Sequence, residues 1–183
     1  MKAIMMSIRP EWVEKILNKE KTIEIRRRFP KDYVGWVYIY CTKGKPYLSS
    51  NSFKYYIAEH YEKYMGNHNG KVVARFWCDK VEHIEYETCS RDISGWWKDN
   101  GEMFNHKEAC LTYEEMFNYI GSGEGYAIHI TKLEIFNKPK PISEFENRTL
   151  TRPRNLNPCV VANGYFVRPL TRAPESFCYI EID

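Results

Sequence analysis

The sequence predicts a mixed α+β fold, in which strands are interrupted by helices. Two kinds of pattern carry this prediction. Apolar residues at every second position, as in 71–84, are typical of strands, and apolar residues three and four positions apart, as in 10–18, are typical of helices. The two patterns do not alternate regularly, which favours α+β over a doubly wound sheet. The 183 residues suffice for one large domain or a small core with insertions.

The first part of the chain combines strand signals with an amphipathic helix signal. Pro10 suits the first turn of a helix, and Val13, Ile16 and Leu17 follow at spacings of three and four. The apolar start of the chain indicates a buried strand, and a later aromatic-rich stretch indicates a second helix. The elements expected here are strands at 1–8, 21–27 and 36–41 and helices at 10–18 and 51–65.

The rest of the chain predicts more strands than helices. Val72, Ala74 and Phe76 alternate with their neighbours and indicate one long strand, and the glycine-rich stretch 121–125 indicates a loop. The elements expected here are strands at 71–84, 126–136 and 177–182, a short helix at 90–98, a firmer helix at 112–120, a hydrophobic run at 159–167, and irregular segments at 138–141 and 147–158.

Composition excludes several classes of protein. A hydrophobic content of 43% with 15% aromatic residues excludes disorder of the whole chain. No apolar run approaches the roughly 20 residues of a membrane span, and no signal peptide is recognisable. The six cysteines contain no Cys-x-x-Cys pair, which favours a reduced, cytoplasmic protein.

The net charge of +3 is unevenly distributed. Lysine and arginine outnumber the acidic residues in 1–45 and in 132–172, whereas acidic residues prevail in 46–131. If the two basic parts meet, they form a basic face that favours phosphate-rich partners. The alternative is a mixed, solvated surface.

The segment that follows the first predicted helix concentrates ionisable groups at a turn into a strand. Alternation places Glu24 and Arg26 on one face of that strand, together with Thr22, and Lys21 lies at the turn. A carboxylate and a guanidinium two residues apart can brace each other and bind a ligand. The alternative is a surface ion pair, which is worth less than about 1 kcal/mol.

The spacing of Lys21, Glu24 and Arg26 resembles the Gly-x-Lys-x-x-Glu-x-Arg signature of the ASCH domain, a branch of the PUA-like superfamily. Lys19 replaces the glycine of that signature, and we expect Asn18 to adopt the positive φ instead. Segments 125–130 and 172–180 also look like a late core strand and the closing strand of bacterial and phage-type members. The resemblance implies a PUA-like β-barrel of mixed strands with flanking helices. It also implies one domain over 1–183, with helical elaborations at about 46–69 and 86–122.

The resemblance first suggests an RNA- or nucleobase-binding module. Lys21 and Arg26 would bind phosphate, and Glu24 would accept a hydrogen bond from a base or ribose of single-stranded RNA or a modified nucleoside. Ser7 and Arg9, at the start of the first helix, are candidates to hold a phosphate. The candidates for base stacking are Tyr126 and the pair Trp96 and Trp97.

The second hypothesis is an enzyme. Some ASCH proteins are amidohydrolases acting on acetylated cytidine, and others have been assigned ribonuclease activity. In the amidohydrolases the signature lysine is catalytic, which corresponds to Lys21, but the position of their threonine is held by Glu24. Thr22 is the only nearby hydroxyl, and Glu82 and Glu85 are candidates for the further carboxylate. A deep pocket at Lys21 would favour catalysis, and an open groove would favour binding.

Metal and cofactor chemistry finds little support in the sequence. Five residues offer soft ligands, but their spacing matches no compact zinc pattern: Cys78, His83, Cys89, His106 and Cys110. Nucleotide-binding and nucleophile motifs are also missing. We therefore expect no metal, no cofactor and no membrane partner.

Overall fold

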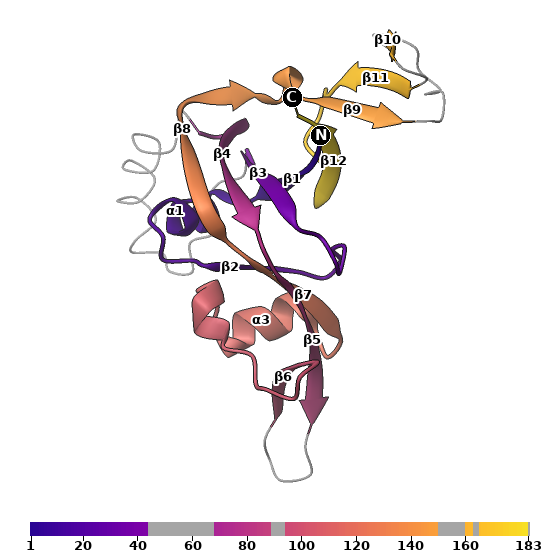
Figure 1. The fold of residues 1–183 in the computed structure, drawn as a ribbon. Coiled ribbons are helices and arrows are strands. Elements are labelled where there is room, and N and C mark those ends of the chain that lie inside the picture. Colours follow the sequence, from indigo (N-terminus) through magenta and orange to yellow (C-terminus); the bar gives the residue numbers. More distant parts are fainter. Residues whose placement is uncertain (44–67, 89–93, 150–159, 163–164, 183) are drawn as a thin grey trace. The chain divides into compact units, whose positions relative to one another are not determined.

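The computed structural model describes residues 1–43, 68–88, 94–149, 160–162 and 165–182 (Figure 1). These residues form a mixed α+β structure that is mostly sheet, with two α-helices, as the sequence predicts. The elements in chain order are β1 (Lys2–Ile8), α1 (Pro10–Leu17), β2 (Ile23–Arg26), β3 (Gly35–Cys41), β4 (Lys71–Cys78), β5 (Val81–Thr88), β6 (Ser94–Lys98), the 3-10 helix η1 (His106–Ala109), α3 (Tyr113–Ile120), β7 (Glu124–His129), β8 (Thr131–Pro141), the 3-10 helix η2 (Ile142–Glu144), β9 (Glu146–Thr149), β10 (Val160–Ala162), β11 (Tyr165–Pro169) and β12 (Phe177–Glu181).

The chain divides into two compact units. The first unit consists of Met1–Glu14, Trp36–Arg75 and Glu134–Asp183, and the second unit consists of Lys15–Gly35 and Phe76–Leu133. Of the two sheets, one has eight strands in the order β10-β11-β9-β12-β1-β3-β4-β8, and the other has four strands in the order β2-β7-β5-β6. Among the described residues neither sheet closes on itself. The closed barrel implied by the resemblance is therefore not seen.

The first unit is organised around β1, which pairs with β3 in parallel and with β12 in antiparallel orientation. Every residue from Ala3 to Ile8 is buried, as the apolar start of the sequence predicts. One face of β1 joins a core cluster whose buried members are Ala3, Met5, Tyr38, Tyr40, Val72, Phe145 and Ile180. β1 is thus an interior strand that holds β3 and β12 in register.

The second unit packs one face of its sheet against α3. Thr112 caps α3 by accepting a hydrogen bond from the backbone N–H of Glu115, and the Glu115 carboxylate accepts one from the backbone N–H of Thr112. The buried face of the helix carries Met116 and Ile120. They join a core cluster that also contains Ile23, Ile25, Ile84, Trp96, Phe104, Ala109 and Ala127. The side chains of β2 that alternate with Ile23 and Ile25 therefore belong to the opposite face of the sheet.

Several predicted elements are confirmed and others are corrected. The helices at 10–18 and 112–120 and the strands at 1–8, 21–27, 36–41 and 177–182 are present, within a few residues at their ends. The long strand predicted at 71–84 is divided into β4 and β5, and the strand predicted at 126–136 is divided into β7 and β8. The helix predicted at 51–65 and most of the elaboration at 46–69 lie outside the described residues.

Three further predictions are wrong over their described residues, and the first is the irregular segment predicted at 147–158, which forms strand β9 as far as Thr149. The short helix predicted at 90–98 is strand β6 over its described part, because Trp96 faces the core where it pairs with Tyr86 of β5. Segment 138–141, expected to be irregular because of its prolines, forms the end of β8. The elaboration at 86–122 is thus only partly helical, since it contributes β6 as well as η1 and α3.

Candidate functional site

The turn between α1 and β2 brings Lys21 to the site. Lys19 lies in the left-handed region with φ 62°, and the backbone N–H groups of Lys19 and Glu20 donate to carbonyls of the last helical turn, those of Ile16 and Lys15. The expectation that Asn18 would take the positive φ is wrong. Lys19 itself adopts that conformation, at the position where the signature has glycine.

Lys21 is a buried cation, with only 2% of its surface exposed. Its Nζ donates to the carbonyl oxygen of Ala109 at 2.5 Å and lies 3.3 Å from Oε2 of Glu24. The Ala109 carbonyl belongs to the end of η1, where Cys110 adopts a left-handed conformation with φ 53°. Burial lowers the pKa of Lys21, and the neighbouring Glu24 carboxylate opposes part of this shift.

Glu24 lies between two cations. Its Oε1 is 2.9 Å from Nη2 of Arg26, while its Oε2 faces Lys21. Glu24 and Arg26 are both buried, with 6% and 8% of their surfaces exposed. Period-two alternation places both on the face of β2 opposite Ile23 and Ile25. We call Lys21, Glu24 and Arg26 the ionic triplet. It brings together the three residues of the signature, but it leaves little of their surface open to solvent.

Tyr126 extends the same face of the sheet beyond the triplet. In the β-ladder Arg26 of β2 pairs with Tyr126 of β7, which pairs in turn with His83 of β5. The Tyr126 ring centroid lies 5.5 Å from that of His83 and 6.0 Å from Nζ of Lys31. Tyr126 is only 8% exposed, so the ring expected to stack on a base is largely covered.

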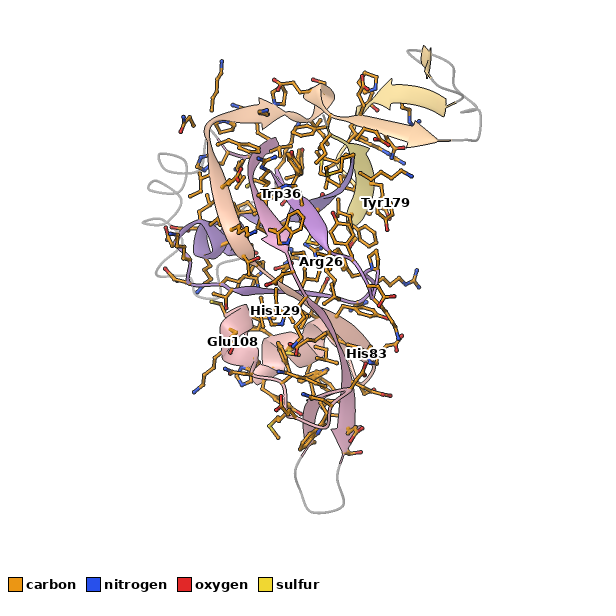
Figure 2. The ribbon with its side chains drawn as sticks, viewed as in Figure 1. Arg26, Trp36, His83, Glu108, His129 and Tyr179 are labelled. Atoms are coloured by element: carbon orange, nitrogen blue, oxygen red, sulfur yellow. The ribbon has the colours of Figure 1, made fainter. Side chains whose placement is uncertain are left out.

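His83 is a residue that sequence reasoning did not assign to this site (Figure 2). Its Nδ1 lies 2.7 Å from Oδ1 of Asp99, and its Nε2 lies 3.0 Å from Oε2 of Glu124. The hydrogen bond with Asp99, supported by Glu124, raises the pKa of His83. Nothing near His83 in the sequence signals this role, because its neighbours come from β7 and from the residue after β6.

Glu82 belongs to a second polar group, on the opposite face of this sheet. It pairs with Ala127, which pairs with Ile25, so its side chain shares the face that packs against α3. Its carboxylate lies 2.7 Å from both Lys80 Nζ and His129 Nε2. Burial alone would raise its pKa, but the hydrogen bonds from Lys80 and His129 outweigh this effect and hold the pKa of Glu82 at about 2.

The other groups considered for hydrolase chemistry do not reach the triplet. Glu82 is on the opposite face of the sheet. Glu85 is on the same face as the triplet, but it pairs with Glu124, two residues along β7 from Tyr126, the partner of Arg26. The hydroxyl of Thr22 donates to the carbonyl oxygen of Glu108 at 3.5 Å. Glu82 and Glu85 therefore do not supply the second carboxylate of the amidohydrolases at the triplet, and the Thr22 hydroxyl bonds to Glu108.

Ser7 and Arg9 belong to the first unit. The Ser7 hydroxyl donates to the carbonyl oxygen of Pro174 at 2.7 Å, and Ser7 is buried. The Arg9 side chain is exposed, while its carbonyl oxygen accepts the backbone N–H groups of Trp12 and Val13 at the start of α1. Ser7 thus ties β1 to the segment before β12, and Arg9 keeps a solvated charge.

The tryptophan pair differs in exposure. Trp96 is 3% exposed and packs edge-on against Tyr86, whereas Trp97 is half-buried. Within the part of the chain that the structure describes, no group of three or more His, Cys, Asp or Glu residues could hold a metal ion. In that same part, no helix is long and apolar enough to cross a membrane.

Comparison with known proteins identifies the fold. No protein-family model matches the sequence, and no curated protein matches it either. A crystal structure of a serine-to-alanine variant of the ASCH protein from Zymomonas mobilis is similar, with a TM-score of 0.51 and 15% identity over 97% of this chain and 87% of that chain. Two other crystal structures of that protein, one unsubstituted and one a tyrosine-to-phenylalanine variant, give TM-scores of 0.47 and 0.45 at 16% and 15% identity. They cover 76% of this chain and 73% and 75% of theirs. The chain therefore has an ASCH-type fold, as the signature predicts.

Proposed function

We propose that this chain binds single-stranded RNA, or a free nucleobase in unmodified or modified form, at the ionic triplet. The observation that carries the proposal is the convergence of three charged groups, with Glu24 at 3.3 Å from Lys21 and 2.9 Å from Arg26. The ammonium and the guanidinium bind phosphate, for which arginine offers a fork of donors. Glu24 accepts a hydrogen bond from a base or ribose and supplies the preference among ligands.

Burial supports a functional origin of these charges. Removing an ion from water costs several kcal/mol, and apolar side chains of similar size would stabilise the unit as well or better. All three side chains are nonetheless less than one-tenth exposed. A stability role alone therefore explains them poorly, whereas a ligand that exchanges contacts with them gives each charge a use. The proposal implies that binding uncovers the triplet or part of Tyr126.

Of the remaining candidate residues Ser7, Arg9 and Tyr126, only Tyr126 belongs to the same unit as the triplet and has a supporting role in this proposal. Tyr126 pairs directly with Arg26 in the β2–β7 ladder, and it offers the edge of its ring or its hydroxyl to the ligand. Ser7 and Arg9 belong to the first unit, where Arg9 is an exposed cation and the Ser7 hydroxyl bonds to Pro174, so they are candidates for a phosphate on their own and not part of the triplet.

The second candidate is a hydrolase acting on a modified nucleoside or on RNA. One observation favours it: burial lowers the pKa of Lys21, which brings a neutral amine, and so a proton acceptor, closer to neutral pH. The positions of Glu82 and Glu85 weaken it, because neither supplies a second carboxylate beside Lys21. Binding therefore remains the preferred function.

A salt titration on labelled single-stranded RNA of different base composition tests the proposal. Wild-type affinity should fall as salt rises, with a log–log slope of roughly −0.7 per phosphate contact. Lys21→Ala and Arg26→Ala should each weaken binding about five-fold, which corresponds to about 1 kcal/mol. Glu24→Gln should leave the affinity for phosphate unchanged or raise it, while removing any preference among bases.

Lys15→Ala is the matched control, because Lys15 belongs to the same unit, 41% of its side chain is exposed and its partner Glu20 lies 4.0 Å away. It should bind as the wild type does. Near-ultraviolet circular dichroism identifies variants that have lost their packing. Such a variant is replaced by Arg26→Lys or Lys21→Arg, which keeps the positive charge and changes only the geometry of the donors. Wild-type binding that is absent at low salt, or folded Lys21 and Arg26 variants that bind like wild type, would contradict the proposal. Release of an acyl group or cleavage of the RNA would favour the hydrolase.

A further inference from the structure

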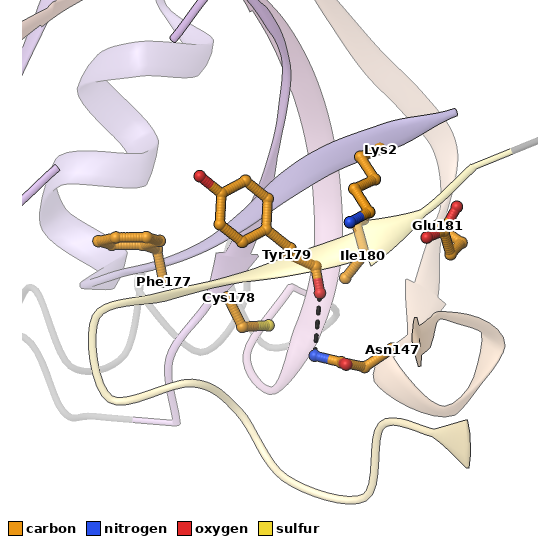
Figure 3. A pocket seen from close by; sticks show the side chains of 7 residues that line it. All are labelled: Lys2, Asn147, Phe177, Cys178, Tyr179, Ile180 and Glu181. Atoms are coloured by element: carbon orange, nitrogen blue, oxygen red, sulfur yellow. Dashed lines mark hydrogen bonds between the residues drawn. The ribbon is translucent and has the colours of Figure 1, made fainter. Parts of the chain in front are cut away.

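The hollow beside β12 in the first unit does not bring its polar groups together. Its volume is ≈ 350 Å³ (Figure 3). Lys2 and Tyr179 lie on one face of the β1–β12 ladder, whereas Asn147, Cys178 and Ile180 lie on the other face (Figure 3). A small ligand in the hollow would therefore contact only one of these groups, and we assign none to it.

The imidazole of His83, in the second unit, is engaged at both of its ring nitrogens. Its Nδ1 lies 2.7 Å from Oδ1 of Asp99, and its Nε2 lies 3.0 Å from Oε2 of Glu124. A neutral imidazole carries a single N–H, so it can donate to one carboxylate only and would turn a lone pair toward the other. The imidazolium donates to both. This arrangement therefore fits the protonated form of His83.

The two carboxylates depend on His83 for their positions. The side chains of Asp99 and Glu124 are 76% and 60% exposed, whereas that of His83 is only 13% exposed. Within the described ranges, neither carboxylate forms an ion pair with any other residue. Because an exposed carboxylate is well solvated, leaving His83 costs it little. When His83 loses its proton, one of the two carboxylates is therefore released into solvent.

The charged and titratable groups that face His83 come from every element around it: Asp99 after β6, Glu124 and Tyr126 of β7, and Lys31 between β2 and β3. The hydrogen bonds to Asp99 and Glu124 raise the pKa of His83 above 6.5, although burial and Lys31 oppose this shift. Glu85, two residues along β5, lies directly opposite Glu124 in the β5–β7 ladder, where like charges repel each other. The imidazolium thus offsets part of the charge of three carboxylates.

His83 shares a row of the sheet with one member of the ionic triplet (Figure 2). Arg26 of β2 pairs with Tyr126 of β7, and Tyr126 pairs with His83 of β5. Neighbouring strands lie about 4.8 Å apart, so His83 is two strands, or roughly 10 Å, from Arg26. At this distance the gain or loss of one unit charge alters the binding of an anion at Arg26.

We propose that His83 is a pH-sensitive switch that controls anion binding at the ionic triplet. Protonated His83 holds Asp99 and Glu124 and offsets their charge. Loss of the proton releases one carboxylate and leaves the row beside Tyr126 more negative by one unit charge, which weakens the binding of a phosphate-bearing strand. The control of binding rests on the function proposed above for the triplet, whereas the release of the carboxylate is a property of the protein alone.

An NMR titration of the free protein tests the release without RNA. Ring resonances of His83 report its protonation, and the side-chain carboxyl resonances of Asp99 and Glu124 report their release. We expect His83 to titrate above pH 6.5, and one of the two carboxyl resonances to move in the same pH range. Asp99→Asn should lower the pKa of His83, because the hydrogen bond to Asp99 raises it most. Glu102→Gln, which removes an exposed carboxylate of the same unit, should leave that pKa unchanged.

Binding of a short labelled oligoadenylate between about pH 6 and pH 9 at low salt tests the control of the triplet. Because burial also lowers the pKa of Lys21, the wild-type profile is compared with that of His83→Gln, which stays neutral. At about pH 6 the wild type should bind about two- to four-fold more tightly, from one unit charge at roughly 10 Å and an effective dielectric constant of about 40–80. The two affinities should converge as the pH rises past the pKa of His83. His129→Gln is the control, because His129 lies on the opposite face of the sheet, and it should follow the wild type.

The two experiments separate failure of the switch from failure of the triplet. The proposal is overturned if His83 titrates at or below pH 6.5, if neither carboxyl resonance follows it, or if folded His83→Gln binds like wild type at about pH 6. Absence of RNA binding at every pH contradicts the function of the triplet and the control of binding with it. The NMR titration then still decides whether His83 releases a carboxylate.

Discussion

Lys19, close to the ionic triplet, is a non-glycine residue with a positive φ. Its φ of 62° lies in the left-handed region, where a Cβ approaches the following carbonyl and costs roughly 1–2 kcal/mol. The backbone N–H groups of Glu20 and Lys21 both donate to the carbonyl oxygen of Lys15. This turn therefore sets the direction in which the chain leaves α1 at Lys21. The position of Lys21 thus depends on a conformation that lysine adopts at a cost.

We therefore predict that Lys19→Gly stabilises the protein. Glycine removes the steric cost but loses more chain entropy on folding, so the net gain should be about 0.5–1 kcal/mol. Thermal and urea denaturation measure it. Glu20→Gly is the matched control, because Glu20 is not among the residues with positive φ and should lose stability. An unchanged or lower stability of Lys19→Gly would show that the turn is not strained.

At the scale of elements, the sheet of the second unit places a different polar group on each face. On the face packed against α3, Glu82 of β5 holds Lys80 and His129, and Lys98 of β6 lies 3.4 Å from the same carboxylate. Because the pKa of Glu82 is lowered from 4.5 to about 2, its charge stabilises the fold above pH 4.5. That contribution is lost as the pH falls toward about 2.

We predict that Glu82→Gln lowers the free energy of unfolding at neutral pH by up to about 3 kcal/mol. This follows from the lowered pKa of Glu82, because each pKa unit corresponds to about 1.36 kcal/mol. The difference from wild type should shrink between pH 4.5 and about 2, because the wild-type carboxylate becomes protonated there. Urea denaturation at a series of pH values measures the difference. Glu102→Gln removes a carboxylate that is 67% exposed and 3.7 Å from Lys98, and it should have little effect. A constant difference across this pH range would contradict the assignment.

The same sheet shows which parts of the site the sequence can predict. The triplet is local, since its three residues lie within one turn and one strand, and their spacing sufficed to group them. Its other contacts come from far along the chain: the Ala109 carbonyl is 88 residues from Lys21, and His83 reaches the Arg26 rung only through the β5–β7 ladder. Alternation within one strand carries no information about such a register. It therefore could not reveal His83, nor the burial of Tyr126.

At the scale of the whole molecule, the boundary between the two units does not follow linkers. The chain passes from one unit to the other after Glu14, Gly35, Arg75 and Leu133, and each of these positions lies inside a regular element, namely α1, β3, β4 and β8. Independent domains are normally joined by exposed segments that few contacts cross. In this protein, by contrast, a helix or a strand continues through each of the four positions at which the chain passes from one unit to the other (the crossings).

We therefore predict that the protein unfolds in one cooperative transition, as the single domain inferred from the sequence implies. The calorimetric and van't Hoff enthalpies of thermal unfolding should agree. Fluorotryptophan NMR in urea gives separate probes, with Trp36 in the first unit and Trp96 in the second. Met116→Ala, which removes a fully buried side chain of the second unit, should lower the midpoint at both probes equally, by about 2–5 kcal/mol in stability. A shift of the midpoint at Trp96 alone would contradict the prediction, because the units would then unfold separately. The helix and strands that continue through the crossings would in that case not couple the stability of one unit to that of the other.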